Sequence, residues 1–223
     1  MNIRICGTGS ALPERKITND DLSQIMDTSD EWISSRTGIK TRHLATEETT
    51  TSLATEAAKK ALADADMKPE EVELIIAATV TPDHLVPTLS CEVQREIGAV
   101  NAVAFDLGAA CSGFLFALST AQAYIASGRF KNALLIGAEV LSKIMDWNDR
   151  STCVLFGDGA GAAVVRADEE NICHVVQGSD GAKGLVLACE NRPVNNPYHK
   201  MESPLGYAVS YTHLRAHETD SYL

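Results

Sequence analysis

The 223-residue chain shows no sequence pattern for membrane insertion or secretion. It lacks an uninterrupted apolar run long enough to cross a bilayer, and residues 1–6 enter a strand-like pattern without a signal peptide. Positive charge is also scarce, because 19 Lys and Arg residues face 30 Asp and Glu residues, for a net charge of −11. This balance argues against a general nucleic-acid binder. We therefore expect neither a membrane nor a nucleic acid as a partner.

Paired cysteines are missing as well. No two Cys residues form a C-x-x-C motif, so the sequence indicates neither a zinc site nor a thioredoxin-like redox site. Their scattered distribution, with several inside apolar strand-like runs, fits a reduced cytoplasmic protein without a metal. The six residues are Cys6, Cys91, Cys111, Cys153, Cys173 and Cys189.

What the sequence does contain is an alternation of strand and helix patterns. Continuous apolar strands separated by helices predict an α/β fold with a mostly parallel sheet covered on both faces. Residues 152–165 depart from this pattern and predict two strands around a glycine turn, and residues 171–188 predict further strands and loops. The expected strands are residues 3–8, 74–80, 102–107 and 133–138, and the expected helices are residues 19–26, 50–65, 88–97 and 113–126.

Cys111 lies between a predicted buried strand, residues 102–107, and a predicted helix, residues 113–126. A thiol at a helix start experiences the partial positive charge and the unpaired N–H groups there, which favour the thiolate. Its small neighbours leave room for a substrate, as a nucleophilic cysteine requires. The alternative is a structural cysteine packed by small residues. The strand-to-helix elbow favours catalysis.

Residues 105–118, around Cys111, resemble the active-site segment of 3-oxoacyl-[acyl-carrier-protein] synthase III. This family initiates type II fatty acid synthesis and belongs to the thiolase-like superfamily. The resemblance implies a layered α-β-α-β-α fold, of which the N-terminal half is complete and the C-terminal half only begun. It also implies a homodimer. Four further blocks match in order and spacing, at residues 7–13, 27–39, 148–152 and 156–162.

The resemblance implies a two-step acyl transfer. An acyl-CoA acylates Cys111, with the Cys111 backbone N–H as an oxyanion donor. Malonyl-acyl carrier protein then loses CO2, and its carbanion attacks the acyl-cysteine to give a 3-oxoacyl carrier protein. Acyl-CoA and malonyl-acyl carrier protein are thus the expected partners. The acyl-CoA is a substrate, so no cofactor is expected.

Further site residues follow from the same resemblance. Trp32 and Arg150 match the family residues that stack on either side of the CoA adenine, and both side chains suit a flat heterocycle. Thr28 and Arg36 match positions near the nucleotide and its phosphates. Val86 matches a residue of the acyl pocket that reaches across the dimer, where a medium-sized side chain predicts room for longer or branched primers. The alternatives are a core aromatic for Trp32 and a solvated helix charge for Arg36.

The glycine-rich stretch at residues 157–161 does not indicate a phosphate-binding loop. Such a loop lies between a strand and a helix N-terminus, whereas strand-like residues 154–156 and 163–165 flank these glycines. We interpret them as a tight turn with close packing.

The family's catalytic histidine and asparagine come from a C-terminal half that has no matching block here. None of the six His residues lies in a family-like context, so we predict that the chain lacks condensation activity. We divide it into residues 1–170, a start of the second half at residues 171–209, and a non-native tail at residues 210–223. The tail resembles translated sequencing-adapter DNA, although an ordinary polar terminus is the alternative.

Two other functions remain open on the sequence alone. One is a related CoA-dependent acyltransferase, similar to 3-hydroxy-3-methylglutaryl-CoA synthase, which shares the cysteine elbow but uses a glutamate as acid and base. The other is a non-catalytic fragment. The blocks at residues 27–39 and 148–152 favour the condensing enzyme.

Overall fold

The computed structural model describes residues 2–170, 174–184, 188–189, 197–198 and 209–210. The chain divides into two compact units. Unit 1 contains Met1–Thr18, Thr41–Leu141 and Gly157–Val175, and unit 2 contains Asn19–Lys40, Ser142–Phe156 and Val176–Leu223.

Unit 1 is built on a five-stranded sheet with the order β1-β7-β6-β4-β5. The interior strand β4 runs parallel to β5 and β6, whereas β7 runs antiparallel to both β6 and β1. Because β1 and β6 both run antiparallel to β7, four of the five strands run in one direction, which confirms the prediction of a mostly parallel sheet; β7 is the antiparallel member of this sheet. An antiparallel neighbour such as β7 needs no crossover helix, and the helix spacing in the sequence does not reveal it. The strands are β1 (Asn2–Ala11), β4 (Leu74–Ala78), β5 (Val103–Leu107), β6 (Asn132–Val140) and β7 (Asp158–Asp168).

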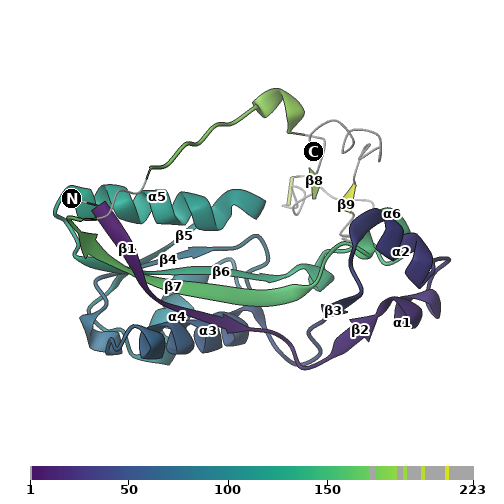
Figure 1. Ribbon diagram of the computed structural model, residues 1–223, viewed down its shortest axis with the longest axis horizontal. Coiled ribbons are helices and arrows are strands. Elements are labelled where there is room, and N and C mark those ends of the chain that lie inside the picture. The colour runs from purple at the N-terminus through teal and green to yellow at the C-terminus, as the bar shows by residue number, and fades with distance from the viewer. Residues whose placement is uncertain (1, 171–173, 185–187, 190–196, 199–208, 211–223) are drawn as a thin grey trace. The chain divides into compact units, whose positions relative to one another are not determined.

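Helices cover both faces of this sheet, as predicted (Figure 1). Helix α5 (Gly113–Ala126) lies on one face, and α3 (Thr50–Asp64) and α4 (Leu89–Ile97) lie on the other. Each face has its own apolar core. Every residue of β4 is buried, because a central strand covered on both faces leaves no side for polar residues.

Small residues set the distance between α3 and the sheet. A Cβ atom at Gly9 would lie 2.2 Å from the carbonyl oxygen of Ala57, and one at Gly7 would lie 2.4 Å from the Ala65 nitrogen. Glycine in β1 opposite an alanine-rich helix therefore permits this close approach. At its start, α3 has a reciprocal capping box between Thr49 and Ser52.

Two predictions about strands are wrong. Strand β5 is at the sheet edge and only partly buried, with Val103 49% exposed, because its place in the sheet is set by long-range pairing. The predicted glycine turn also lies elsewhere, since Gly159 and Gly161 belong to β7 and the residues before it form the short helix α6 (Arg150–Cys153). A Cβ at Gly159 would lie 2.9 Å from the end of the Leu12 side chain, and no phosphate loop forms here because the glycines lie within a strand.

The remaining elements are short. Unit 1 also contains the antiparallel pair of β2 (Lys16–Thr18) and β3 (Thr41–His43), and unit 2 contains α1 (Asn19–Ser23) and α2 (Asp30–Thr37). Short 3-10 turns occur at Pro69–Glu71, Ala110–Ser112, Leu141–Lys143 and Gly181–Lys183, and β8 (Ala188–Cys189) pairs with β9 (Val209–Ser210).

The predicted helices at residues 50–65, 88–97 and 113–126 are confirmed to within one residue. The boundaries proposed at residues 170 and 209 stay predictions, and most of the predicted tail lies outside the described residues. Among the described residues, no helix combines the length and apolar character needed to cross a membrane.

Candidate active site

Cys111 lies in the elbow between β5 and α5. Strand β5 ends at Leu107, a 3-10 turn spans Ala110–Ser112, and α5 begins at Gly113. The residue is exposed and its thiol is free. This placement agrees with the sequence prediction and is incompatible with a buried structural cysteine. Its catalytic role stays a prediction.

The local sequence forms this elbow through small side chains. A Cβ atom at Gly113 would lie 2.8 Å from Ala78 Cβ, so glycine allows the start of α5 to pack against the end of β4. Ala110 adopts a left-handed backbone conformation with φ of 44°, which is strained for a residue with a side chain. Strain of this kind occurs often beside functional residues.

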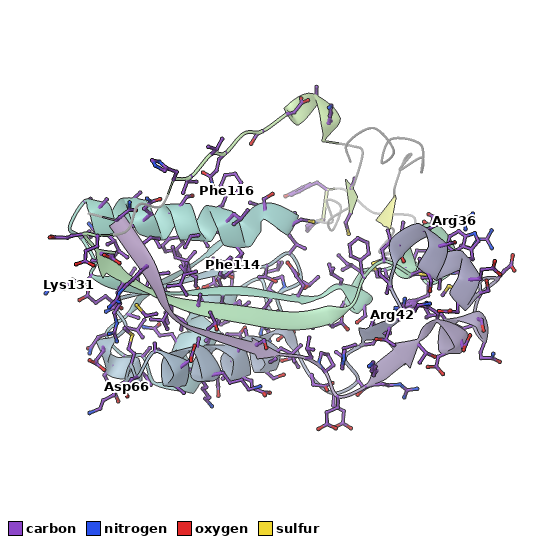
Figure 2. The ribbon with its side chains drawn as sticks, viewed as in Figure 1. Arg36, Arg42, Asp66, Phe114, Phe116 and Lys131 are labelled. Carbon is purple, nitrogen blue, oxygen red and sulfur yellow. The ribbon has the colours of Figure 1, made fainter. Side chains whose placement is uncertain are left out.

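The start of α5 lies beside the thiol. The N–H groups of Ser112 and Gly113 donate to the carbonyls of Ala109 and Ala110 in the preceding 3-10 turn. The aligned peptides of the helix give its start a partial positive charge. An exposed thiol beside such a helix start can combine a nucleophile with oxyanion stabilisation. Further along α5, Phe114 faces the sheet near Gly137 and Phe116 points away from it (Figure 2).

The segment between β4 and α4 carries Val86, which was predicted to line an acyl pocket. Val86 is 86% exposed, so it closes no cavity within the single chain. The segment around it is nevertheless anchored at both ends. The Asp83 carboxylate accepts hydrogen bonds from the first N–H groups of α3. The Asp106 carboxylate accepts hydrogen bonds from the N–H groups of Leu89 and Ser90, each at 2.8 Å.

Glu139, near the end of β6, anchors the same segment and was not singled out from the sequence. Its largely buried carboxylate accepts hydrogen bonds from the Val80 N–H at 2.8 Å and from the hydroxyls of Thr79 and Thr81. Burial raises the pKa of Glu139 above its ordinary value of 4.5, although these hydrogen bonds oppose the shift. An isolated acidic residue at the end of an apolar strand gives no sequence signal for such a network.

A second group of predicted residues lies in unit 2. Trp32 is on α2, with Arg36 one turn later on the same helix and Arg150 at the start of α6. The guanidinium carbons of Arg36 and Arg150 lie 4.6 and 5.0 Å from the centre of the Trp32 ring. The structure thus brings together Trp32, Arg36 and Arg150, and Figure 2 shows Arg36 on α2.

Local capping orients these side chains. The Ser29 hydroxyl accepts a hydrogen bond from the Trp32 N–H at 3.1 Å, which starts α2, and Gly38 ends it with φ of 72°. The buried Asn19 side chain donates to the Asp30 carboxylate at 2.8 Å and to the Ile39 carbonyl at 2.7 Å, which ties both ends of the helix together. Asn19 is also the main reason that the pKa of Asp30 is lowered.

Thr28, the remaining predicted nucleotide contact, precedes this helix. Its hydroxyl oxygen is buried and has no hydrogen-bond partner among the residues that the structure describes. A buried hydroxyl normally makes a hydrogen bond, so the Thr28 hydroxyl can still form one beside the helix that carries Trp32. Within the described part of the chain, no cluster of His, Cys, Asp or Glu residues could hold a metal ion.

The sequence of this chain is similar to those of known proteins. The family model for 3-oxoacyl-[acyl-carrier-protein (ACP)] synthase III matches residues 105–181, which include Cys111. Beta-ketoacyl-[acyl-carrier-protein] synthase III of Clostridium acetobutylicum is 54% identical over 198 residues, covering 88% of this chain and 61% of the relative. The corresponding protein of Streptococcus pneumoniae is 53% identical over 193 residues, covering 86% of this chain and 60% of the relative.

A solved structure from the same family is also similar to this chain. The 3-oxoacyl-[acyl-carrier-protein] synthase III of Aquifex aeolicus superposes with a TM-score of 0.83 at 52% identity, covering 85% of this chain and 62% of that one. The chain therefore spans about three-fifths of the length of the relatives that it matches.

Proposed function

Because this chain is a homologue of beta-ketoacyl-[acyl-carrier-protein] synthase III, we propose that the complete protein is an initiating condensing enzyme of fatty acid synthesis. The mixed sheet between helices is the N-terminal half of the thiolase-like α/β fold. The name shared by the relatives described above favours this function over an acyltransferase similar to 3-hydroxy-3-methylglutaryl-CoA synthase.

The proposed chemistry begins at Cys111. Its thiolate attacks the thioester carbonyl of an acyl-CoA, the carbon–sulfur bond to CoA breaks, and CoA leaves as the thiolate. Malonyl-acyl carrier protein then loses CO2, and the electron pair of the broken bond attacks the acyl-cysteine carbonyl. The 3-oxoacyl carrier protein forms and the Cys111 thiolate is released. The Cys111 N–H stabilises the oxyanion of the first step.

The observation that carries this proposal is the exposed thiol at the start of α5. Nucleophilic cysteines need access to the substrate and an electropositive surrounding. The exposure of Cys111 supports the first requirement, and its position at a helix start supports the second. Thr28, Trp32, Arg36 and Arg150 form the proposed CoA site, because a buried free hydroxyl and an indole with two guanidinium groups suit an adenine nucleotide.

Other parts of the proposal concern the complete protein. Malonyl-acyl carrier protein is the proposed second substrate, and the protein is proposed to be a cytoplasmic homodimer in which Val86 helps to line the partner's acyl pocket. We also propose that the catalytic histidine and asparagine belong to a part of the protein that this chain does not contain.

Acylation of the purified chain tests the proposal. After incubation with acetyl-CoA, we expect peptide mass spectrometry to find an acetyl group on Cys111 in the wild type and no acetylated cysteine in Cys111→Ser. The half-buried Cys91 is the internal control, because it should remain unmodified. Equal labelling of Cys91 and Cys111 would contradict a selective nucleophile. We expect no 3-oxoacyl product with malonyl-acyl carrier protein, and robust turnover would contradict the missing catalytic half.

A further inference from the structure

Strand β1 forms one edge of the sheet in unit 1 (Figure 1). One side of it pairs with β7, in an unbroken register from Gly7 opposite Val164 to Ala11 opposite Ala160. The other side of an edge strand presents backbone N–H and C=O groups to which a second chain can pair. With 10 residues, β1 is longer than a typical strand of about five to six residues. Its outer side is therefore an extended template for strand addition.

Two side chains of α3 bond to backbone groups on this outer side. The Asp64 carboxylate accepts a hydrogen bond from the Thr8 N–H at 2.8 Å, and the Lys60 ammonium donates to the Ser10 carbonyl at 2.9 Å. Because the Thr8 N–H bonds to α3, it does not point toward β7. Backbone groups alternate in direction along a strand, so Thr8 and Ser10, two residues apart, both face outward.

The spacing of the helix matches that of the strand. Lys60 and Asp64 are four residues apart on one face of α3, a rise of about 6 Å. Thr8 and Ser10 are separated by about 6.6 Å along β1. A Cβ atom at Gly9 would lie 2.7 Å from Lys60 Cβ, so the glycine between them leaves space for the lysine stem beside the strand.

We propose that Asp64 and Lys60 close the outer side of β1, so that β1 of a second copy of this chain cannot pair with it and extend the sheet. An incoming antiparallel strand exchanges an N–H and a C=O bond with each outward-facing residue. Thr8 and Ser10 each have one of these two groups already bonded. The Glu56 carboxylate, 2.6 Å from the Lys60 ammonium, holds that side chain in place.

A purely structural role for these bonds predicts a different result from closure. The Lys60 side chain is 53% exposed, and exposed charged contacts contribute little to stability. If the two bonds only stabilise the fold, their removal should lower stability slightly and leave self-association unchanged. If they close the edge, their removal should change self-association far more than stability.

The test compares the 223-residue chain with the double variant Lys60→Ala and Asp64→Ala, which leaves the formal net charge at −11. In sedimentation velocity, the variant should associate at least about tenfold more strongly than the wild type, because the opened edge gains main-chain hydrogen bonds. Hydrogen exchange locates the contact. The Thr8 amide should exchange faster in the dilute variant than in the wild type, and it should become protected as the variant's concentration rises.

Three further variants sharpen the comparison. Asp64→Asn with Lys60→Arg keeps an acceptor and a donor at these positions and should associate like the wild type. Lys59→Ala removes an exposed cation from the same helix and should also leave association unchanged. Lys60→Met keeps the apolar stem and frees the Ser10 carbonyl alone, so it should strengthen association less than the double variant does.

The outcomes decide the role of the two side chains. A folded double variant that associates no more strongly than the wild type would overturn the proposal. Stronger association without concentration-dependent protection of Thr8 would overturn it as well, because another surface would then be the contact. If circular dichroism shows the double variant to be unfolded, Lys60→Met takes its place, and an unchanged association constant in that variant contradicts closure.

Discussion

The half-buried carboxylate of Glu139 makes the stability of unit 1 depend on pH. Burial raises its pKa in the folded state above the ordinary value of 4.5. A group whose pKa is raised on folding stabilises the folded state fully below the unfolded pKa, and this contribution is lost as pH rises through the folded pKa. We therefore expect Glu139→Gln, which keeps an acceptor for the Val80 N–H, to remove a loss of stability that begins just above pH 4.5 in the wild type.

Urea unfolding at a series of pH values measures this effect. Glu48→Gln is the control with the opposite sign, because backbone N–H groups, first that of Thr46, lower the pKa of Glu48 to about 2. The contribution of Glu48 is present above pH 4.5 and is lost as pH falls toward 2. An unchanged pH profile in Glu139→Gln would show that the carboxylate does not titrate differently in the folded chain.

At the scale of elements, the start of α4 depends on a residue from another strand. Thr88 occupies the N-cap position but its side chain makes no capping bond, whereas Asp106 of β5 accepts from the N–H groups of Leu89 and Ser90. We expect Asp106→Ala to lower the free energy of unfolding by about 2 kcal/mol, in the range for a lost cap that leaves donors unpaired. Thr88→Ala should lower it by less, about 0.5–1 kcal/mol, because this variant removes only the hydrogen bond between the hydroxyls of Thr88 and Ser90.

Hydrogen exchange locates this effect. The amides of Leu89 and Ser90 should exchange faster in Asp106→Ala, while those of α3 should keep their protection. Uniform loss of protection across unit 1 would contradict a local capping role and indicate instead that Asp106 supports the whole sheet.

The elements that sequence predicts well are those fixed by local signals. Helix α5 follows from its apolar residues and from the Ser127-Gly128 end, and α3 follows from its alanine-rich face. The glycines of β7 predicted a turn, but long-range pairing with β1 and β6 makes residues 158–168 a strand. The exposure of β5 depends on its edge position, which only strand pairing determines.

The sequence likewise predicts some parts of the candidate site and not others. The elbow around Cys111 follows from a strand pattern, small residues and a helix pattern in succession. The contact between Trp32 and Arg36 could also be expected, because residues four apart share one face of a helix. Glu139 could not, since its partners Thr79, Val80 and Thr81 come from another strand end.

At the scale of the whole molecule, an anchored segment that exposes apolar side chains predicts self-association. Leu85 and Val86 are 73% and 86% exposed, although acidic side chains fix the chain on either side of them. A rigid apolar surface loses little conformational entropy on binding, and it matches the homodimer proposed for the complete protein. We expect the chain to self-associate at micromolar concentrations, and the double variant Leu85→Ser with Val86→Ser to weaken this association at least about tenfold.

Sedimentation velocity over a range of concentrations measures the association, and urea unfolding should show a change below about 0.5 kcal/mol, because both side chains are already exposed. Ile25→Ser is the matched control, since Ile25 is a similarly exposed apolar residue of unit 2, at 66%. If Ile25→Ser weakens association as much as the double variant does, general surface hydrophobicity drives it. If only the double variant acts, the segment between β4 and α4 is the contact, and its anchoring by Glu139 and Asp106 then serves to hold that contact in place.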